Sequence, residues 1–336
     1  MKFKARSIFS KIESGDFEPD RVLPHGETCL HLASREGCAS IIEALVLYHN
    51  SKAILSKDHD GKCPIHEAVI YNKVECVKVL LKHGSPVNPL KRSDWTPLMH
   101  ACENANYEIF KILVDAGANI NLVNKDGWSS LHLASRSGSL EIVKFLIEKD
   151  PNLVLLKTTN GRTALHCASL NNREKICEYF LENKSFGIDV QDSCGTTALC
   201  DAIKTDNVSI INLFYKFSAD LKIPDSNGNY PVHIACQTDC CNSLKILINL
   251  GVDPKAPSIN STGNNCAQFA VSRNSLNCIT FLLQFDSKLF TLEDNGGVTA
   301  LDLVNSSRTL DLVKTCFPNA QMVKTENKYK LNDLLK

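Results

Sequence analysis

The sequence predicts an all-α solenoid of about nine helix-pair repeats, with short β-hairpin fingers between successive repeats. Three observations carry this prediction. A motif recurs every 33 to 35 residues, a small residue recurs five places after its start, and an apolar segment with helical spacing follows most copies. A period of this length is typical of stacked supersecondary units that share one continuous core.

The motif begins at a residue that is usually Thr or Ser, side chains suited to capping the start of a helix. Its nine starting positions are Thr28, Cys63, Thr96, Ser129, Thr163, Thr197, Tyr230, Asn265 and Thr299. The small residue five places later is Ala in the first eight copies and Val304 in the ninth. Because a small side chain allows close approach, we expect the first helix of each repeat to lie tightly against its neighbour.

Five repeats carry a histidine three places after the motif start: His31, His66, His132, His166 and His233. A catalytic histidine needs a nucleophile and an orienting partner, and no such set accompanies these residues. We therefore interpret them as structural, with hydrogen bonds inside and between repeats.

Second helices are predicted where apolar residues recur at helical spacing. The segments are Val77–Leu81, Phe110–Val114, Val143–Ile147, Ile176–Leu181, Ile210–Phe214, Leu244–Ile248 and Ile279–Leu283. Gly84, Gly117 and Gly251 stand where a helix commonly ends. Asp-Gly and Asn-Gly pairs, such as Asp126-Gly127, predict tight turns at the tips of the fingers.

The two ends of the chain are expected to differ from the repeats. Residues 1–20 are interpreted as an N-terminal cap with a short amphipathic helix over Arg6–Asp16, because an open stack of repeats needs a polar outer face. Residues 21–317 form the predicted solenoid. Residues 318–336 are predicted to be a polar tail, whose last leucines would allow a short helix.

Charge and cysteine content narrow the function. Lys plus Arg and Asp plus Glu both number 37, so we expect no direct nucleic-acid binding. No run approaches the roughly 20 apolar residues that cross a bilayer, so no membrane partner is expected.

The 15 cysteines are scattered, and no signal peptide is recognised ahead of them. We expect free thiols, a cytoplasmic and also nuclear location, and a monomer.

Motifs for catalysis or metal binding are weak. No phosphate-binding glycine loop, HExxH pair or carboxylate dyad stands in its required context, so the sequence favours a binding protein over an enzyme and implies no cofactor. His233, Cys236, Cys240 and Cys241 come nearest to a metal site. They lack a second ligand pair at zinc-finger spacing, and a metal is therefore not predicted.

The most distinctive surface features are two tryptophans and three lysines. Trp95 and Trp128 lie 33 residues apart, each one residue ahead of a motif start. Each ring either packs on the neighbouring finger or contacts a partner, and tryptophans at interface centres often carry much of the binding energy. Lys91, Lys125 and Lys157 precede their motifs by five, four and six residues. All three should project from the same side of consecutive repeats, about 10 Å apart.

The motif resembles the T-P-L-H-x-A signature of the ankyrin repeat. Three segments resemble a narrower ankyrin-repeat family, an editing partner of alanyl-tRNA synthetase: Asp94–Met99, Asn124–Trp128 and Cys194–Leu199. Met99 in place of the motif histidine is part of this likeness. The resemblance extends from about Thr28 to Leu303.

This resemblance implies a protein that binds the catalytic domain of alanyl-tRNA synthetase and takes misactivated serine onto lysine side chains before it reaches tRNA. The implied acceptors are Lys125 and Lys157, and the third falls on Arg92, directly after Lys91. An arginine cannot act as an amine nucleophile at neutral pH. Either Lys91 replaces it, or the chain has two acceptors. Because the product is a stable amide, the protein would be a stoichiometric acceptor and not an enzyme.

A neighbouring cation would lower the pKa of an acceptor amine, and the candidates are Arg92 beside Lys91 and Arg162 near Lys157. The alternative function is a protein-interaction scaffold without covalent chemistry, with Trp95, Trp128 and Arg92 in contact with the partner. An adaptor of ubiquitin ligases would need a separate ligase-binding segment. The tail Gln321–Lys336 is too short and polar to resemble one, so this third function is not favoured.

Overall fold

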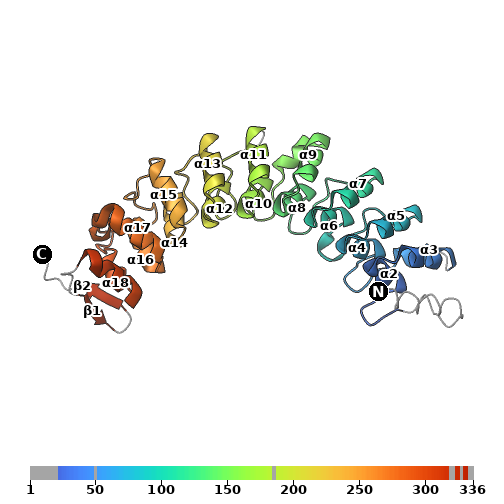
Figure 1. Ribbon diagram of the computed structural model, residues 1–336, viewed down its shortest axis with the longest axis horizontal. Helices are drawn as coiled ribbons and strands as arrows, with labels where there is room; N and C mark the ends of the chain where they lie inside the picture. The colour runs from blue at the N-terminus through green and yellow to red at the C-terminus, as the bar shows by residue number, and fades with distance from the viewer. Residues whose placement is uncertain (1–21, 49–50, 184–186, 318–321, 326–327, 332–336) are drawn as a thin grey trace. The chain divides into compact units, whose positions relative to one another are not determined.

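The computed structural model describes residues 22–48, 51–183, 187–317, 322–325 and 328–331. The chain divides into two compact units, residues 1–159 and 160–336. Within each unit, the first helix of a repeat packs against the second helix of the same repeat and against the first helix of the next (Figure 1). This arrangement confirms the predicted stack of helix pairs.

The described part of the first unit holds four helix pairs. Their first helices are α2 (Cys29–Glu36), α4 (Pro64–Ile70), α6 (Pro97–Glu103) and α8 (Ser130–Ser137). Their second helices are α3 (Ala39–Tyr48), α5 (Val74–Lys82), α7 (Tyr107–Asp115) and α9 (Leu140–Lys149). Short 3-10 helices occupy three of the connections: η1 (Ser51–Leu55), η2 (Arg92–Asp94) and η3 (Pro151–Leu155).

The described part of the second unit continues the pattern. Its first helices are α10 (Ala164–Leu170), α12 (Ala198–Lys204), α14 (Pro231–Gln237) and α16 (Cys266–Arg273). Its second helices are α11 (Glu174–Glu182), α13 (Val208–Lys216), α15 (Cys241–Asn249), α17 (Leu276–Asp286) and α18 (Ser307–Cys316). The 3-10 helices are η4 (Ser287–Thr291) and η5 (Leu301–Leu303), and η5 stands where the ninth repeat would have its first helix.

The motif residues act as predicted at the starts of the first helices. The Thr96 hydroxyl accepts the N–H of Met99 at 3.2 Å, which satisfies one of the free N–H groups at the start of α6. The recurring alanines are buried, and Ala68, Ala101 and Ala134 have no exposed surface. A larger side chain would push the first helices apart, so the Ala positions fix the close stacking of each unit.

The motif histidines are structural, as the sequence indicates. In all five, Nδ1 accepts the N–H of the motif residue at 3.0–3.2 Å. Because Nδ1 is the acceptor, the proton belongs on Nε2, which can donate to a carbonyl of the next repeat. His66 Nε2 lies 3.3 Å from the Trp95 carbonyl, and His233 Nε2 lies 2.9 Å from the Ala256 carbonyl. Burial lowers the pKa of His66 to about 3 and that of His233 to about 4, so both rings are neutral.

The C-terminal tail differs from the predicted short helix where the structure describes it. Within the tail, β1 (Met322–Thr325) and β2 (Lys328–Leu331) pair antiparallel, so its described part is a small hairpin and not the short helix that was expected. The pairing joins Met322 to Leu331 and Thr325 to Lys328. The predicted N-terminal cap, with its helix over Arg6–Asp16, lies outside the described residues.

Candidate docking and acceptor edge

We call the five residues directly ahead of each motif start a finger. In the first unit, the fingers 58–62, 91–95 and 124–128 are joined by backbone hydrogen bonds at their tips. The N–H of Arg92 donates to the Asp60 carbonyl at 2.7 Å, and the N–H of Lys125 donates to the Ser93 carbonyl at 3.1 Å. Arg92 and Lys125 therefore occupy the same position, the second of the finger, on consecutive repeats.

The first position of a finger normally accepts hydrogen bonds. Asp58 Oδ1 accepts the N–H groups of Asp60 and Lys62 at 2.9 and 2.8 Å. Asn124 Oδ1 accepts those of Asp126 and Trp128 at 3.0 and 2.9 Å. This side-chain turn stabilises a tight loop. In the finger 91–95 the same position is Lys91, whose ammonium group is only a donor and cannot close the turn.

The finger 91–95 also carries unusual backbone conformations. Ser93 and Asp94 have φ values of 63° and 60°, in the left-handed region. Gly127 holds the place of Asp94 in the next finger, with φ of 73°. Two consecutive side-chain-bearing residues in this region store conformational strain, and such strain is concentrated at functional sites. The finger is closed by a single antiparallel bridge between Lys91 and Trp95, in keeping with the short hairpin fingers that the sequence predicts.

The side chain of Lys91 turns onto the indole of Trp95. Its Nζ lies 5.5 Å from the centre of the ring, within the range of a cation–π contact. Both side chains are half-buried. Burial lowers the pKa of Lys91, and the nearby cation of Lys62 lowers it further. The neighbouring cation that matters is thus Lys62, from the preceding finger, and not the adjacent Arg92 that the sequence suggested.

The ring of Trp95 packs on a side chain of its own repeat. It stacks on the imidazole of His100 in α6, with ring centres 4.8 Å apart and planes 22° from parallel. His100 Nδ1 lies 3.4 Å from a carboxylate oxygen of Glu103. His100 is buried, and this burial lowers its pKa. The stack holds one face of the indole and leaves the residue partly open to solvent.

Trp128 is held in a related way. Its ring meets His132 edge-on at 6.1 Å, and the guanidinium carbon of Arg136 lies 5.0 Å from the ring centre. Arg136 Nη2 in turn lies 2.5 Å from Glu103 Oε1. Glu103 therefore connects the surroundings of the two tryptophans across the repeats. The motif pattern did not single out Glu103 or Arg136, although both stand seven places after their motif starts.

The other predicted residues lie on exposed parts of the same edge. Lys125 and Lys157 are exposed, and Lys157 directly precedes the finger that begins at residue 158. The Arg92 side chain is 81% exposed and has only a loose contact with Asp60, at 3.7 Å. Arg162 does not serve as a free cation, because its guanidinium pairs with two carboxylates, Asp192 at 3.2 Å and Asp201 at 2.5 Å.

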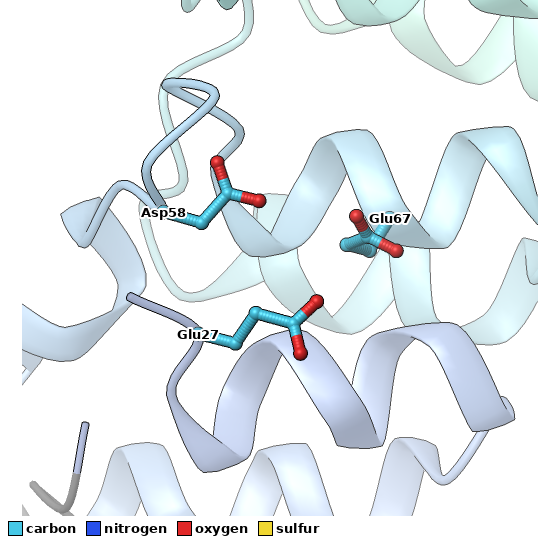
Figure 2. Close-up of side chains that lie close together, drawn as sticks. All are labelled: Glu27, Asp58 and Glu67. Carbon is cyan, nitrogen blue, oxygen red and sulfur yellow. The ribbon is translucent and has the colours of Figure 1, made fainter. Parts of the chain in front are cut away.

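One acidic group resembles a metal site but is neutralised by cations. Figure 2 shows Glu27, at the end of the finger 23–27, with Asp58 of the finger 58–62 and Glu67 of α4, whose carboxylates come within 4.8 Å of one another. Arg35 Nε lies 2.8 Å from Glu67 Oε2, and the same guanidinium contacts Glu27. Lys62 Nζ lies 3.2 Å from Glu67 Oε1. Two cations thus offset these carboxylates, and the group is a structural ion-pair network.

The cysteine-rich segment 233–241 in the second unit also has a structural role. Both ring nitrogens of His233 are engaged, one by the Tyr230 N–H and the other by the Ala256 carbonyl. Cys236 is fully buried, and burial raises the pKa of its thiol. All 15 cysteines lie in the described residues and are free thiols.

Comparison with known proteins identifies the repeat. The family described as "Ankyrin repeats (3 copies)" matches residues 30–124, 116–192 and 184–258. The chain belongs to the ankyrin repeat family. The ankyrin repeat domain of human ASB11 has the same fold, with a TM-score of 0.60 and 23% identity, over 68% of this chain and 99% of that domain.

Sequence relatives match parts of larger ankyrin proteins. Dog inversin is 26% identical over 273 residues, which are 79% of this chain and 22% of inversin. Mouse protein phosphatase 1 regulatory subunit 27 is 37% identical over 77 residues, 23% of this chain and 50% of that protein. The chain thus spans about a fifth of inversin. Ankyrin repeats are typically protein-interaction scaffolds and not catalytic domains, and among the described helices none is long and apolar enough to cross a membrane.

Proposed function

We propose that this ankyrin protein docks on the catalytic domain of alanyl-tRNA synthetase and accepts misactivated serine on lysine side chains, as a relative of ankyrin repeat domain-containing protein 16. The observation that supports the proposal is that Arg92 and Lys125 occupy the same position in two consecutive fingers. These fingers are joined by the hydrogen bond from the Lys125 N–H to the Ser93 carbonyl. Lys91 adjoins this pair, so amines and tryptophans of the resembling segments share one edge of the first unit.

The proposed chemistry needs no catalytic triad. Seryl-adenylate carries an activated carbonyl carbon that a neutral amine can attack. A bond forms between lysine Nζ and this carbon, the bond from the carbon to the phosphate oxygen breaks, AMP leaves, and a proton passes to water. The product is an amide, so each lysine reacts once. The protein is then consumed as a stoichiometric acceptor, which prevents serine from replacing alanine in proteins.

The state of the amine favours Lys91 as an acceptor. Only roughly one ordinary lysine in two thousand is neutral at pH 7, for a pKa near 10.4. Burial and the Lys62 cation lower the pKa of Lys91, which raises its neutral fraction. Lys125 and Lys157 are exposed, and their reaction relies on proximity to the bound adenylate. We therefore propose three acceptors, with Lys91 in place of the arginine at position 92.

The test is to incubate the protein with the synthetase, ATP and serine and to locate the added seryl groups by mass spectrometry. We expect one seryl unit on each of Lys91, Lys125 and Lys157, and loss of each signal in the matching Lys→Arg variant. Lys111→Arg, in α7, is the control and should keep all of them. A stable complex in which none of the three lysines is modified would exclude the acceptor role.

The second candidate is an interaction scaffold without covalent chemistry. The half-buried rings of Trp95 and Trp128 favour it, because each is held by packing on one side and remains partly open. Under this proposal, Trp95→Ala and Trp128→Ala weaken capture of the synthetase, and no seryl group is transferred in the wild type. We propose a monomer in the cytoplasm, and also in the nucleus, where the free thiols stay reduced.

A further inference from the structure

Lys91 is a half-buried cation that forms no direct ion pair within the part of the chain that the structure describes, although the carboxylates of Asp60, Glu103 and Asp58 stand near enough to oppose the lowering of its pKa. Its ammonium group lies over the Trp95 ring, and the neighbouring cation Lys62 is itself paired with Glu67 at 3.2 Å. The cost of partly desolvating an ammonium group is recovered when a carboxylate meets it. The contact between Lys91 and Trp95 thus offers an anionic group a cation that rests on an apolar ring.

A second available cation lies one repeat further along. Lys125 is exposed, and its backbone is fixed by the hydrogen bond to Ser93 in the preceding finger. Packed helices, and hence consecutive repeats, are spaced about 10 Å apart. An extended chain covers that distance in about three residues, at 3.3–3.6 Å per residue. Two carboxylates with this separation along an extended segment can therefore meet Lys91 and Lys125 together.

The charges around these lysines alternate in sign. Asp60 faces Arg92 at 3.7 Å, and Asp94 and Asp126 stand in the same fingers as Lys91 and Lys125. A polyanion with a phosphate at every step would meet these carboxylates as well as the cations. A protein segment with spaced acidic residues can contact the cations and avoid the acids. The alternation thus favours a peptide over RNA.

We propose that the edge formed by Lys91, Trp95, Lys125 and Trp128 docks an extended acidic segment of a protein partner. The segment carries two carboxylates about three residues apart, one for each lysine, with apolar side chains between them on the indole rings. The inference rests on the proposed docking surface and adds the chemistry of the partner. It does not depend on serine transfer.

The two tryptophans give a direct measurement, because the chain contains no others. A Trp128→Phe variant reports fluorescence from Trp95 alone, and Trp95→Phe reports Trp128 alone. The probe is an acetylated peptide with two glutamates at this spacing and leucines between them. We expect a saturable change in fluorescence for both reporters. Replacing both glutamates with glutamine should weaken binding about tenfold, since both charge-assisted contacts are lost.

Variants of the protein test the same contacts. Lys91→Gln should weaken binding of the glutamate peptide about fivefold, and the loss should shrink at high salt. Lys78→Gln is the matched control, because Lys78 lies on α5 and pairs with Glu75 at 2.8 Å, and it should bind like wild type. Equal binding of glutamate and glutamine peptides, no binding of either, or an unchanged Lys91→Gln variant would each overturn the proposal. Tighter binding of oligouridylate than of the peptide would also overturn it.

Failure here and failure of the proposed function are distinguishable. If the synthetase transfers serine to the lysines but the glutamate peptide neither binds nor competes with it, the acidic-segment proposal is wrong and the acceptor role stands. If the peptide binds through Lys91 but the synthetase does not associate, the surface accepts a different protein with an acidic segment.

Discussion

The ammonium group of Lys91 lies 5.5 Å from the centre of the Trp95 ring, at a finger position where Asp58 and Asn124 instead close a turn. The finger 91–95 thus lacks two stabilising hydrogen bonds that the fingers 58–62 and 124–128 have. Two of its residues, Ser93 and Asp94, also have a left-handed backbone conformation. In exchange, a cation and an indole are held together at the surface. This pattern is typical of a site where function outweighs local stability.

Replacing Lys91 with Asn should stabilise the first unit and weaken partner binding. An Asn side chain accepts the N–H groups two and four residues on, as Asn124 does, so we expect a gain of about 0.5–1 kcal/mol in the free energy of unfolding. Denaturant unfolding measures it. Lys91→Gln removes the same charge without the short side chain that the turn needs, and it should show the weaker binding but not the gain. A less stable Lys91→Asn protein would refute this account of the finger.

Gly127→Ala should destabilise the first unit by about 2 kcal/mol or more. Its φ is 73°, and an added Cβ would lie 2.8 Å from the Thr159 backbone nitrogen, too close without a shift of the next finger. Gly117→Ala is the control, since Gly117 has φ of 92° but nothing within 4 Å of the added Cβ. That variant should lose only about 1 kcal/mol, the cost of the left-handed conformation. Equal losses in thermal or denaturant unfolding would contradict the close packing of the fingers.

Acidification should destabilise the repeats through their buried histidines. The pKa of His66 is lowered to about 3 in the folded protein, below the ordinary value near 6.5 that applies when the chain is unfolded. The unfolded state therefore binds the proton first, and stability that is complete above pH 6.5 is lost as the pH falls toward 3. At pH 5 the loss from this one residue is about 2 kcal/mol. Unfolding followed as a function of pH measures it.

His66→Gln provides the control for this pH dependence. Gln268 already occupies the motif position in one repeat, where its side chain accepts the Asn265 N–H at 2.7 Å and donates to the Val298 carbonyl at 2.7 Å. A glutamine at position 66 should keep both bonds and cannot be protonated. The variant should fold at pH 7 and lose less stability between pH 7 and 5 than the wild type. An unchanged pH profile would show that His66 is not responsible.

Arg162→Met should cost the second unit about 3 kcal/mol, because it leaves a buried carboxylate with less compensation. The Asp201 side chain is only 1% exposed, and Arg162 and Lys204 are its cationic partners. Burial raises the pKa of Asp201 to about 6 despite these cations, so the loss should be smaller at acidic pH, where Asp201 takes up a proton. Arg92→Met, at an exposed site, should change stability by about 0.5 kcal/mol or less. Similar losses of stability in Arg162→Met and Arg92→Met would contradict the claim that Arg162 compensates a buried carboxylate and Arg92 does not.

The repeated architecture was predictable because it depends on local rules that recur. The Thr or Ser start, the histidine and the alanine repeat their spacing along the chain, and the structure gives each the predicted role, as at Thr96, His66 and Ala101. The exception is the ninth repeat, whose first helix shortens to η5 where Val304 replaces the alanine. The β1–β2 pairing in the tail was missed although Lys328–Leu331 alternates between polar and apolar residues, the pattern of a strand.

The site was predicted only in part. The sequence placed Trp95, Trp128, Lys91 and Lys125 on successive fingers, but whether a ring faces a neighbour or its own helix depends on packing across repeats. His100 lies four places after Thr96 and receives the indole, a contact that the motif does not encode. A comparison of the first finger positions, with acids or Asn at 58 and 124 and Lys at 91, would have marked the unusual finger in advance.

The most direct test of the central claim is hydrogen exchange, followed by mass spectrometry, with and without the catalytic domain of alanyl-tRNA synthetase. If the edge from Lys91 to Trp128 is the docking surface, exchange in residues 91–95 and 124–128 should slow on binding. Exchange in the finger 225–229 of the second unit, which closes through Asp225 in the ordinary way, should stay unchanged. A complex that protects other fingers and leaves residues 91–128 unprotected would contradict the claim.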